Sequence, residues 1–172
     1  LVKEYNIELH IITDLSYPLF YKSIYLSTVR KIKNIFGDLY QENIIKKKSS
    51  VFLHQWNIEL VSTILKSCDI AIIPLNKNNT LASGKSINKF IHMLRNELPT
   101  VATDIESYKN IYNSLGFDYS CKNDDDWYKN ISKLIKNPEE IKKFRICSEK
   151  YIQKNFTEKK FIEQWDNLID FF

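Results

Sequence analysis

The sequence predicts an α/β fold: a doubly wound parallel sheet of about five or six strands, followed by a tail of helices. Short apolar runs alternate along the chain with longer segments whose apolar residues recur at helical spacing. One run, "DIAIIPL" at residues 69–75, is apolar at nearly every position, which is typical of a strand buried on both faces of a parallel sheet. The helical pattern that continues from Asp124 onward predicts the tail.

The first part of the chain predicts two strands and two helices. "IELHIIT" at residues 7–13 is an apolar run that ends at Asp14, and "VFLHQW" at residues 51–56 is a second, shorter one. Between them, residues 18–36 carry apolar side chains at helical spacing and begin with a proline, whose missing N–H costs little in a first turn. Asn57 is a suitable N-cap for a helix that follows it directly.

The middle of the chain continues the alternation. After residues 69–75 a helix is predicted from Gly84 to about Asn96, and "LPTVATD" at residues 98–104 supplies a fourth strand. The next helix ends at Gly116, a residue favoured just after a helix C-terminus. "FDYSC" at residues 117–121 is a short fifth strand.

The helical tail has breaks near Pro138 and Thr157 and is too long and too aromatic to be surrounded by solvent. We therefore expect residues 1–122 to form the sheet domain and the helices of residues 123–172 to pack on it or on another lobe. The chain begins at Leu1 and enters a strand almost at once, so we expect a piece of a longer protein. The aromatic residues of the tail are Trp127, Tyr128, Phe144, Tyr151, Phe156, Phe161, Trp165, Phe171 and Phe172.

Composition argues against several classes of protein. A formal net charge of +4 suits anionic ligands or a membrane surface but is too small for a nucleic-acid binder. No apolar run has the length of a membrane span. The cysteines and histidines are scattered, which favours buried thiols in a reducing compartment over disulfides or a metal site. These residues are Cys68, Cys121, Cys147, His10, His54 and His92.

The segment "LASGKSINKFIHML" at residues 81–94 is the strongest candidate for a ligand site. Ligands of doubly wound sheets bind where strands end and helices begin, and the free amides of a helix start attract anions. Gly84 allows close approach of the backbone, Lys85 adds a positive charge, and Ser83 or Ser86 can cap the helix or donate a hydrogen bond.

The same segment predicts an amphipathic helix. Ile87, Phe90, Ile91 and Leu94 form its apolar stripe, whereas Lys85, Asn88, Lys89 and His92 share the other face. An ordinary helix with a solvated basic face is the plain alternative. A Walker A loop is a second alternative, but the required first glycine is replaced by Asn79, and the strand before it ends in Pro74.

Taken in order, motifs between Trp56 and Gly116 resemble the C-terminal half of a GT-B glycosyltransferase of group 1 (family 4), enzymes that build bacterial polysaccharides and lipopolysaccharides. The motifs are "DIAIIPL", then "GKSINK" with its apolar stripe, then "LPTVAT" followed by Glu106 and Tyr108. The resemblance implies a Rossmann-like nucleotide-sugar-binding domain that is one half of a GT-B fold, with the N-terminal acceptor lobe absent from these 172 residues.

The resemblance also implies a function: transfer of a sugar from a nucleoside-diphosphate sugar to a glycan or lipid-linked acceptor. The reaction would take place in the cytoplasm, with peripheral association at the inner face of the membrane as an option. The donor diphosphate would bind at Gly84, Lys85 and Ser86, and its ribose and sugar at Asn88, Lys89 and His92. Neither a cofactor nor a metal is expected, because protein groups offset the charge on the leaving diphosphate.

The chain departs from the family pattern in two respects. The family often has two glutamates separated by seven residues, and counting back from Pro99 places Gly84 and His92 at these positions. The usual glycine two residues before the proline is Glu97 here. A degenerate, non-catalytic lobe that serves as a scaffold or binding module is therefore the alternative function.

Three other features are weaker candidates. Asp14 and Ser16 follow the first strand and are further candidates for the cleft. The carboxylates of residues 124–126 have the spacing to hold a hard cation, but acids at this place also favour the start of a helix. The lysines of residues 46–48 can contact phosphate or lipid headgroups, or can form a solvated loop.

Overall fold

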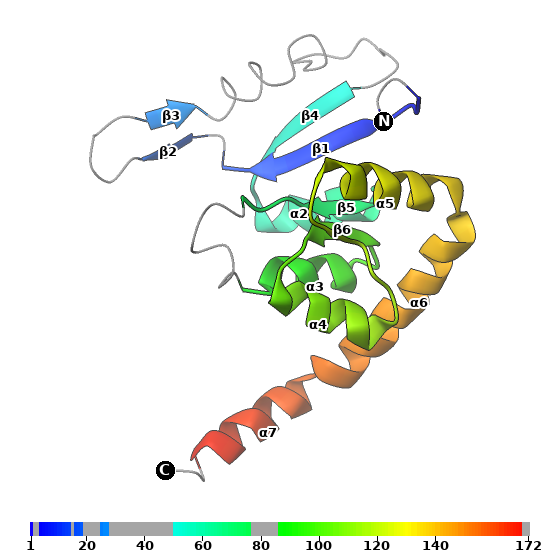
Figure 1. Ribbon diagram of the computed structural model, residues 1–172. Coiled ribbons are helices and arrows are strands. Elements are labelled where there is room, and N and C mark those ends of the chain that lie inside the picture. The colour runs from blue at the N-terminus through cyan, green and yellow to red at the C-terminus, as the bar shows by residue number, and fades with distance from the viewer. Residues whose placement is uncertain (2–3, 15, 19–24, 28–49, 77–85, 170–172) are drawn as a thin grey trace. The chain divides into compact units, whose positions relative to one another are not determined.

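The computed structural model describes residues 1, 4–14, 16–18, 25–27, 50–76 and 86–169 (Figure 1). The chain divides into two compact units, Leu1–Ile64 and Leu65–Phe172, and the division falls within helix α2 (Ile58–Lys66). Each unit contains a parallel sheet, which confirms the α/β class. The described sheets have two or three strands each, so a single sheet of about five or six strands stays a prediction.

The first unit contains two pairs of strands. β1 (Glu8–Thr13) and β4 (Ser50–Gln55) pair in parallel, and both match predicted strands. β2 (Ser16–Pro18) and β3 (Tyr25–Ser27) pair antiparallel. The helix predicted over residues 18–36 is therefore wrong wherever the structure describes this segment. The segment is rich in aromatic and β-branched residues, which favour strands over helices, so helical spacing was a weak basis for the prediction.

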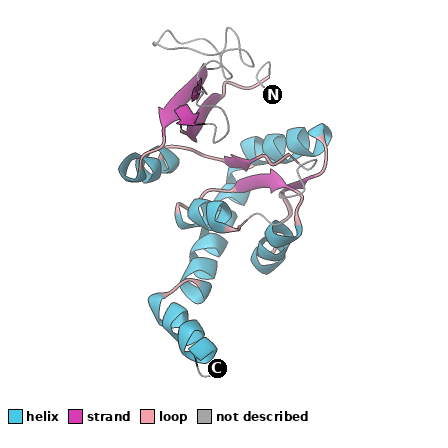
Figure 2. Cartoon of the chain, turned by 90° about the vertical axis from the view of Figure 1, so that its left-hand side faces the viewer, coloured by secondary structure: helices cyan, strands magenta, loops and turns pink. Residues whose placement is uncertain are grey.

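The second unit is built on a three-stranded parallel sheet in the order β5–β6–β7. In sequence, α3, α4 and α5 follow β5, β6 and β7, and both α3 and α5 contact the central strand. Figure 2 shows helices and strands of the chain by type. The predicted elements of this part of the chain are confirmed. The elements are β5 (Ala71–Ile73), α3 (Asn88–Arg95), β6 (Thr100–Thr103), α4 (Glu106–Leu115), β7 (Ser120–Cys121), α5 (Asp124–Lys136), α6 (Pro138–Asn155) and α7 (Glu158–Ile169).

The core of the second unit lies around β6, all four residues of which are buried. Phe90 of α3 packs edge-on against Tyr112 of α4, with ring centroids 5.0 Å apart. The Tyr112 hydroxyl donates a hydrogen bond of 2.6 Å to the backbone carbonyl of Thr100, so this large buried side chain leaves no unpaired polar group. Leu134 of α5 and Phe144 of α6 complete the core.

Helix ends are set by local chemistry. The Asn57 side chain accepts a hydrogen bond from the Glu59 amide at 2.8 Å, as predicted for the N-cap of α2. Gly116 has φ +75°, the left-handed conformation that glycine adopts most easily after a helix. Asn137 caps α6 and precedes Pro138, so the break predicted there is confirmed.

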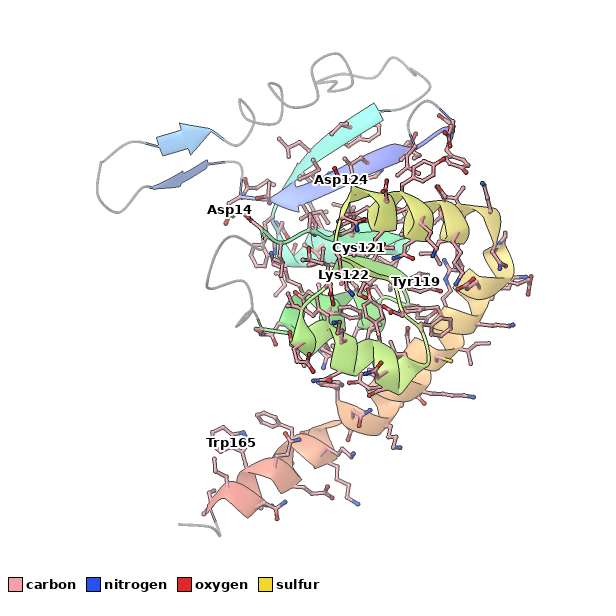
Figure 3. The ribbon with its side chains drawn as sticks, viewed as in Figure 1. Asp14, Tyr119, Cys121, Lys122, Asp124 and Trp165 are labelled. Atoms are coloured by element: carbon pink, nitrogen blue, oxygen red, sulfur yellow. The ribbon has the colours of Figure 1, made fainter. Side chains whose placement is uncertain are left out.

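Helix α7 differs from α5 and α6 because none of its residues is buried. Its large apolar side chains are about half exposed or more, including Trp165, which Figure 3 shows on the side of this helix. No helix in the described part of the chain is both long enough and apolar enough to cross a membrane.

Candidate functional site

The candidate site lies where the strands of the second unit end. Because β5, β6 and β7 are parallel, their carboxyl ends meet at one edge of the sheet, and α3, α4 and α5 start from that edge. The predicted site residues Ser83, Gly84 and Lys85 lie outside the described residues, as do Asn79 and residues 46–48. Ser86, Asn88, Lys89 and His92 are described, and all four are exposed.

Helix α3 begins at Asn88, later than the predicted start at Gly84. The hydroxyl oxygen of Ser86 accepts a hydrogen bond of 3.1 Å from the Asn88 amide. Such a bond to a residue two positions on favours a turn over a helix, which explains why Ser86 lies before α3 and not within it.

The start of α3 has the properties of an anion site. Ile87, at the N-cap, makes no side-chain capping bond, and the first turn contains no acidic residue. The Asn88 amide is paired with Ser86, but the other amides of the first turn and the helix dipole still give this end a positive potential. The carboxylate that would offset this potential in many helices is missing.

The orientation of α3 agrees with the predicted stripe. Phe90, Ile91 and Leu94 are buried in the core of the unit. Asn88 and His92 are one turn apart on the exposed face, so these two side chains project together. The core contacts thus hold the polar face of α3 toward solvent.

The backbone that follows β5 is held by a hydrogen bond to the neighbouring strand, β6. The buried hydroxyl of Thr103, at the end of β6, accepts a hydrogen bond of 2.7 Å from the Leu75 amide. This bond ties the backbone two residues beyond β5 to the central strand. The segment that leads toward the Gly-Lys-Ser sequence therefore departs from an anchored point.

Asp104, the residue directly after β6, was not among the predicted site residues. Its carboxylate is about 10% exposed and lies 2.8 Å from the ammonium of Lys109 in α4. The hydrogen bond and the negative charge of Asp104 raise the pKa of Lys109. Asp104 could have been predicted as a candidate from the sequence, because it is an acidic residue directly after a buried parallel strand. Because Lys109 neutralises it, Asp104 serves to fix the turn from β6 to α4.

The acidic residues of 124–126 form a helix start, as expected from the helix dipole. The Asp126 amide donates to the Asn123 side chain, and the Asp126 carboxylate accepts from the Lys122 amide, each at 2.9 Å. The first bond is a side-chain N-cap, and the second ties the residue before the cap to the first turn of α5. Figure 3 labels Lys122 and Asp124 at this junction between β7 and α5. In the described residues no group of three or more His, Cys, Asp or Glu side chains is arranged to hold a metal.

The remaining predicted residues, Asp14 and Ser16, belong to the first unit, whereas α3 belongs to the second. Asp14 is exposed, and its carboxylate accepts a hydrogen bond of 3.4 Å from Gln55. Ser16 pairs with Ser27 in the short antiparallel ladder.

The first unit brings together two histidines that the sequence places far apart. The ring nitrogens of His10 and His54 are 2.9 Å apart, and the two rings are stacked. Burial and the neighbouring His10 lower the pKa of His54. The two histidines meet because they lie on adjacent parallel strands. The sequence alone does not predict this contact, because it depends on the register of β1 against β4.

Comparison of the chain with protein-family models, with curated proteins and with solved structures gives no match.

Proposed function

We propose that this chain is the donor-binding lobe of a GT-B glycosyltransferase, which transfers a sugar from a nucleoside-diphosphate sugar to a glycan or lipid-linked acceptor. The proposal includes a Rossmann-like, doubly wound sheet of five or six strands, of which the described strands are a part. One observation carries it: a helix that follows "GKS" in sequence starts at the carboxyl edge of a parallel sheet, its N-cap residue, Ile87, makes no side-chain capping bond, and its first turn contains no acid.

The chemistry of this helix start suits a diphosphate. Backbone amides and one ammonium group offset negative charge without a metal, and that charge grows as the nucleotide leaves. Asn88 and His92 on the exposed face offer hydrogen bonds to ribose or sugar hydroxyls. Ser86 already accepts one bond from the Asn88 amide, and its hydroxyl proton is free to reach a ligand.

The backbone at Glu97 also supports the proposal. Its φ is +57°, a left-handed conformation in which glycine is the least strained residue. The family that this chain resembles carries glycine at this position. Glu97 therefore keeps the backbone turn that the glycine serves, although the side chain differs.

Isothermal titration with uridine diphosphate and guanosine diphosphate tests the donor site. We expect weak, saturable binding that Lys85→Ala weakens by about tenfold or more, because a charge-assisted hydrogen bond contributes about 1.5–3 kcal/mol. Lys150→Ala, on an exposed position of α6, is the matched control and should bind as the wild type does. Equal affinity of wild type and Lys85→Ala would rule out this site.

A non-catalytic, degenerate lobe is the second candidate. It is favoured because Gly84 and His92 stand at the two positions where the family often has glutamates. Of these two residues, His92 is described and is exposed. Sugar transfer or donor hydrolysis by the full-length protein would exclude it. Binding of triphosphate that requires magnesium would instead indicate the P-loop alternative.

A further inference from the structure

A basic cavity lies at the C-terminal end of α3, opposite to the end proposed for the donor. It has a volume of about 310 Å³ and lies beside the amino ends of β5 and β6. Three cationic side chains line it, from three different helices: Lys66 of α2, Arg95 of α3 and Arg145 of α6. The other lining residues are Cys68, Asn96 and Glu97.

The charge in this cavity is not balanced. Three cations face one carboxylate, and among the described residues none of these cations makes an ion pair within 4 Å. Burial raises the pKa of the Cys68 thiol, which therefore adds no negative charge. Like charges that converge on a concave surface raise the local concentration of anions.

The use of arginine supports a role in binding. The chain is rich in lysine but has only three arginines, Arg30, Arg95 and Arg145. Both arginines in the described part of the chain line the same cavity. A guanidinium presents two parallel N–H groups that match the oxygens of a phosphate, which a lysine does not.

Helix dipoles explain the positions of only two of the three cations that line the cavity. Lys66 and Arg95 lie in the last turns of α2 and α3, where any cation is favoured. Arg145 lies in the middle of α6 and is half-buried, so the dipole gives no reason for its position. A partly buried cation without a partner is costly, and an anionic ligand would remove that cost.

We propose that this basic cavity binds a phosphate-bearing anion through Arg95, Arg145 and Lys66. Its volume is at the small end of the range for ligand pockets, so a phosphate or diphosphate group fills it better than a whole nucleotide sugar does. The site is separate from the proposed donor site, because the two lie at opposite ends of α3, on the order of 12 Å apart for a helix of eight residues.

Titration of the whole chain with inorganic phosphate and with pyrophosphate, followed by phosphorus NMR, tests the proposal. We expect saturable binding that Arg95→Gln and Arg145→Gln each weaken by about tenfold. Glu97→Gln removes the only carboxylate of the cavity and should tighten binding a few-fold. Lys150→Gln, which removes a charge elsewhere on α6, is the control and should change nothing.

Two further arms separate this site from the donor site and identify the source of the phosphate. Phosphate binding should persist in Lys85→Ala, whereas uridine diphosphate binding should persist in Arg145→Gln. Vesicles of phosphatidylcholine with and without phosphatidic acid test a lipid headgroup. Arg145-dependent binding only to the vesicles that contain phosphatidic acid would assign the anion to lipid. Absence of binding to phosphate, pyrophosphate and these vesicles, or binding unchanged in the Arg95→Gln/Arg145→Gln double variant, would overturn the proposal.

Discussion

The two parallel sheets of this chain differ in how completely they are covered. Every residue of β6 is buried, whereas no residue of β1 is, and of the described side chains of β4 only Val51 is buried. β6 has a hydrogen-bonded strand on each side and contacts α3 and α5. β1 and β4 pair only with each other in the described part of the chain. An apolar run thus predicts a strand, but its burial depends on neighbours elsewhere in the sequence.

The largest expected effect comes from shortening one apolar side chain in each of the two units and comparing the losses of stability. Leu94→Ala should lower the free energy of unfolding of the second unit by about 2–5 kcal/mol, because Leu94 is fully buried and its removal leaves a cavity. Ile11→Ala in half-buried β1 should cost the first unit clearly less. Hydrogen exchange measured residue by residue reports each unit separately. Equal losses in the two variants would contradict the comparison.

Backbone strain gives a smaller effect, confined to the second unit. Glu97→Gly should stabilise it by about 0.5–1 kcal/mol, because glycine relieves the left-handed φ of +57°. Gly116→Ala should destabilise it by a similar amount. A Cβ at Gly116 meets no atom within 4 Å, so only the φ of +75° opposes it. Glu97→Gln controls for loss of the charge and should leave stability unchanged in urea denaturation.

The smallest expected effect is the response to pH, which should differ between the units. Burial and the charge of His10 lower the folded-state pKa of His54 below 6.5, so its contribution to the first unit is present above pH 6.5 and is lost as the pH falls below that value. The second unit should respond only in more acidic solution. Hydrogen bonds from Lys133 and Tyr119 outweigh the effect of burial on Glu140 and lower its pKa below 4.5.

Hydrogen exchange at pH 7.5, 5.5 and 4.0 would separate the two responses. Between the first two values, protection should fall in the first unit and stay constant in the second. The His54→Gln variant should remove the change in the first unit. Simultaneous loss of protection in both units between pH 7.5 and 5.5 would show that the histidine pair is not the cause.

Most elements of the second unit could be predicted, and the reasons are local. The apolar stripe of α3 and the glycine after α4 act within a few residues. Helix α3 starts later than its spacing predicts, because the bond from the Asn88 amide to Ser86 competes with the helix at that end. The helix predicted from Pro18 is wrong at the described residues, because spacing alone cannot distinguish a helix from paired strands in a stretch of aromatic and β-branched residues.

The sequence by itself determined the α/β alternation, the ends of most helices and the polar face of α3, since these depend on residues close together in the chain. Only the tertiary structure decided that His10 meets His54, that Asp104 holds Lys109 at the edge of the sheet, and that Lys66, Arg95 and Arg145 share one cavity. The physical reason is strand register and helix packing. These bring together side chains whose separation in sequence carries no signal of their contact.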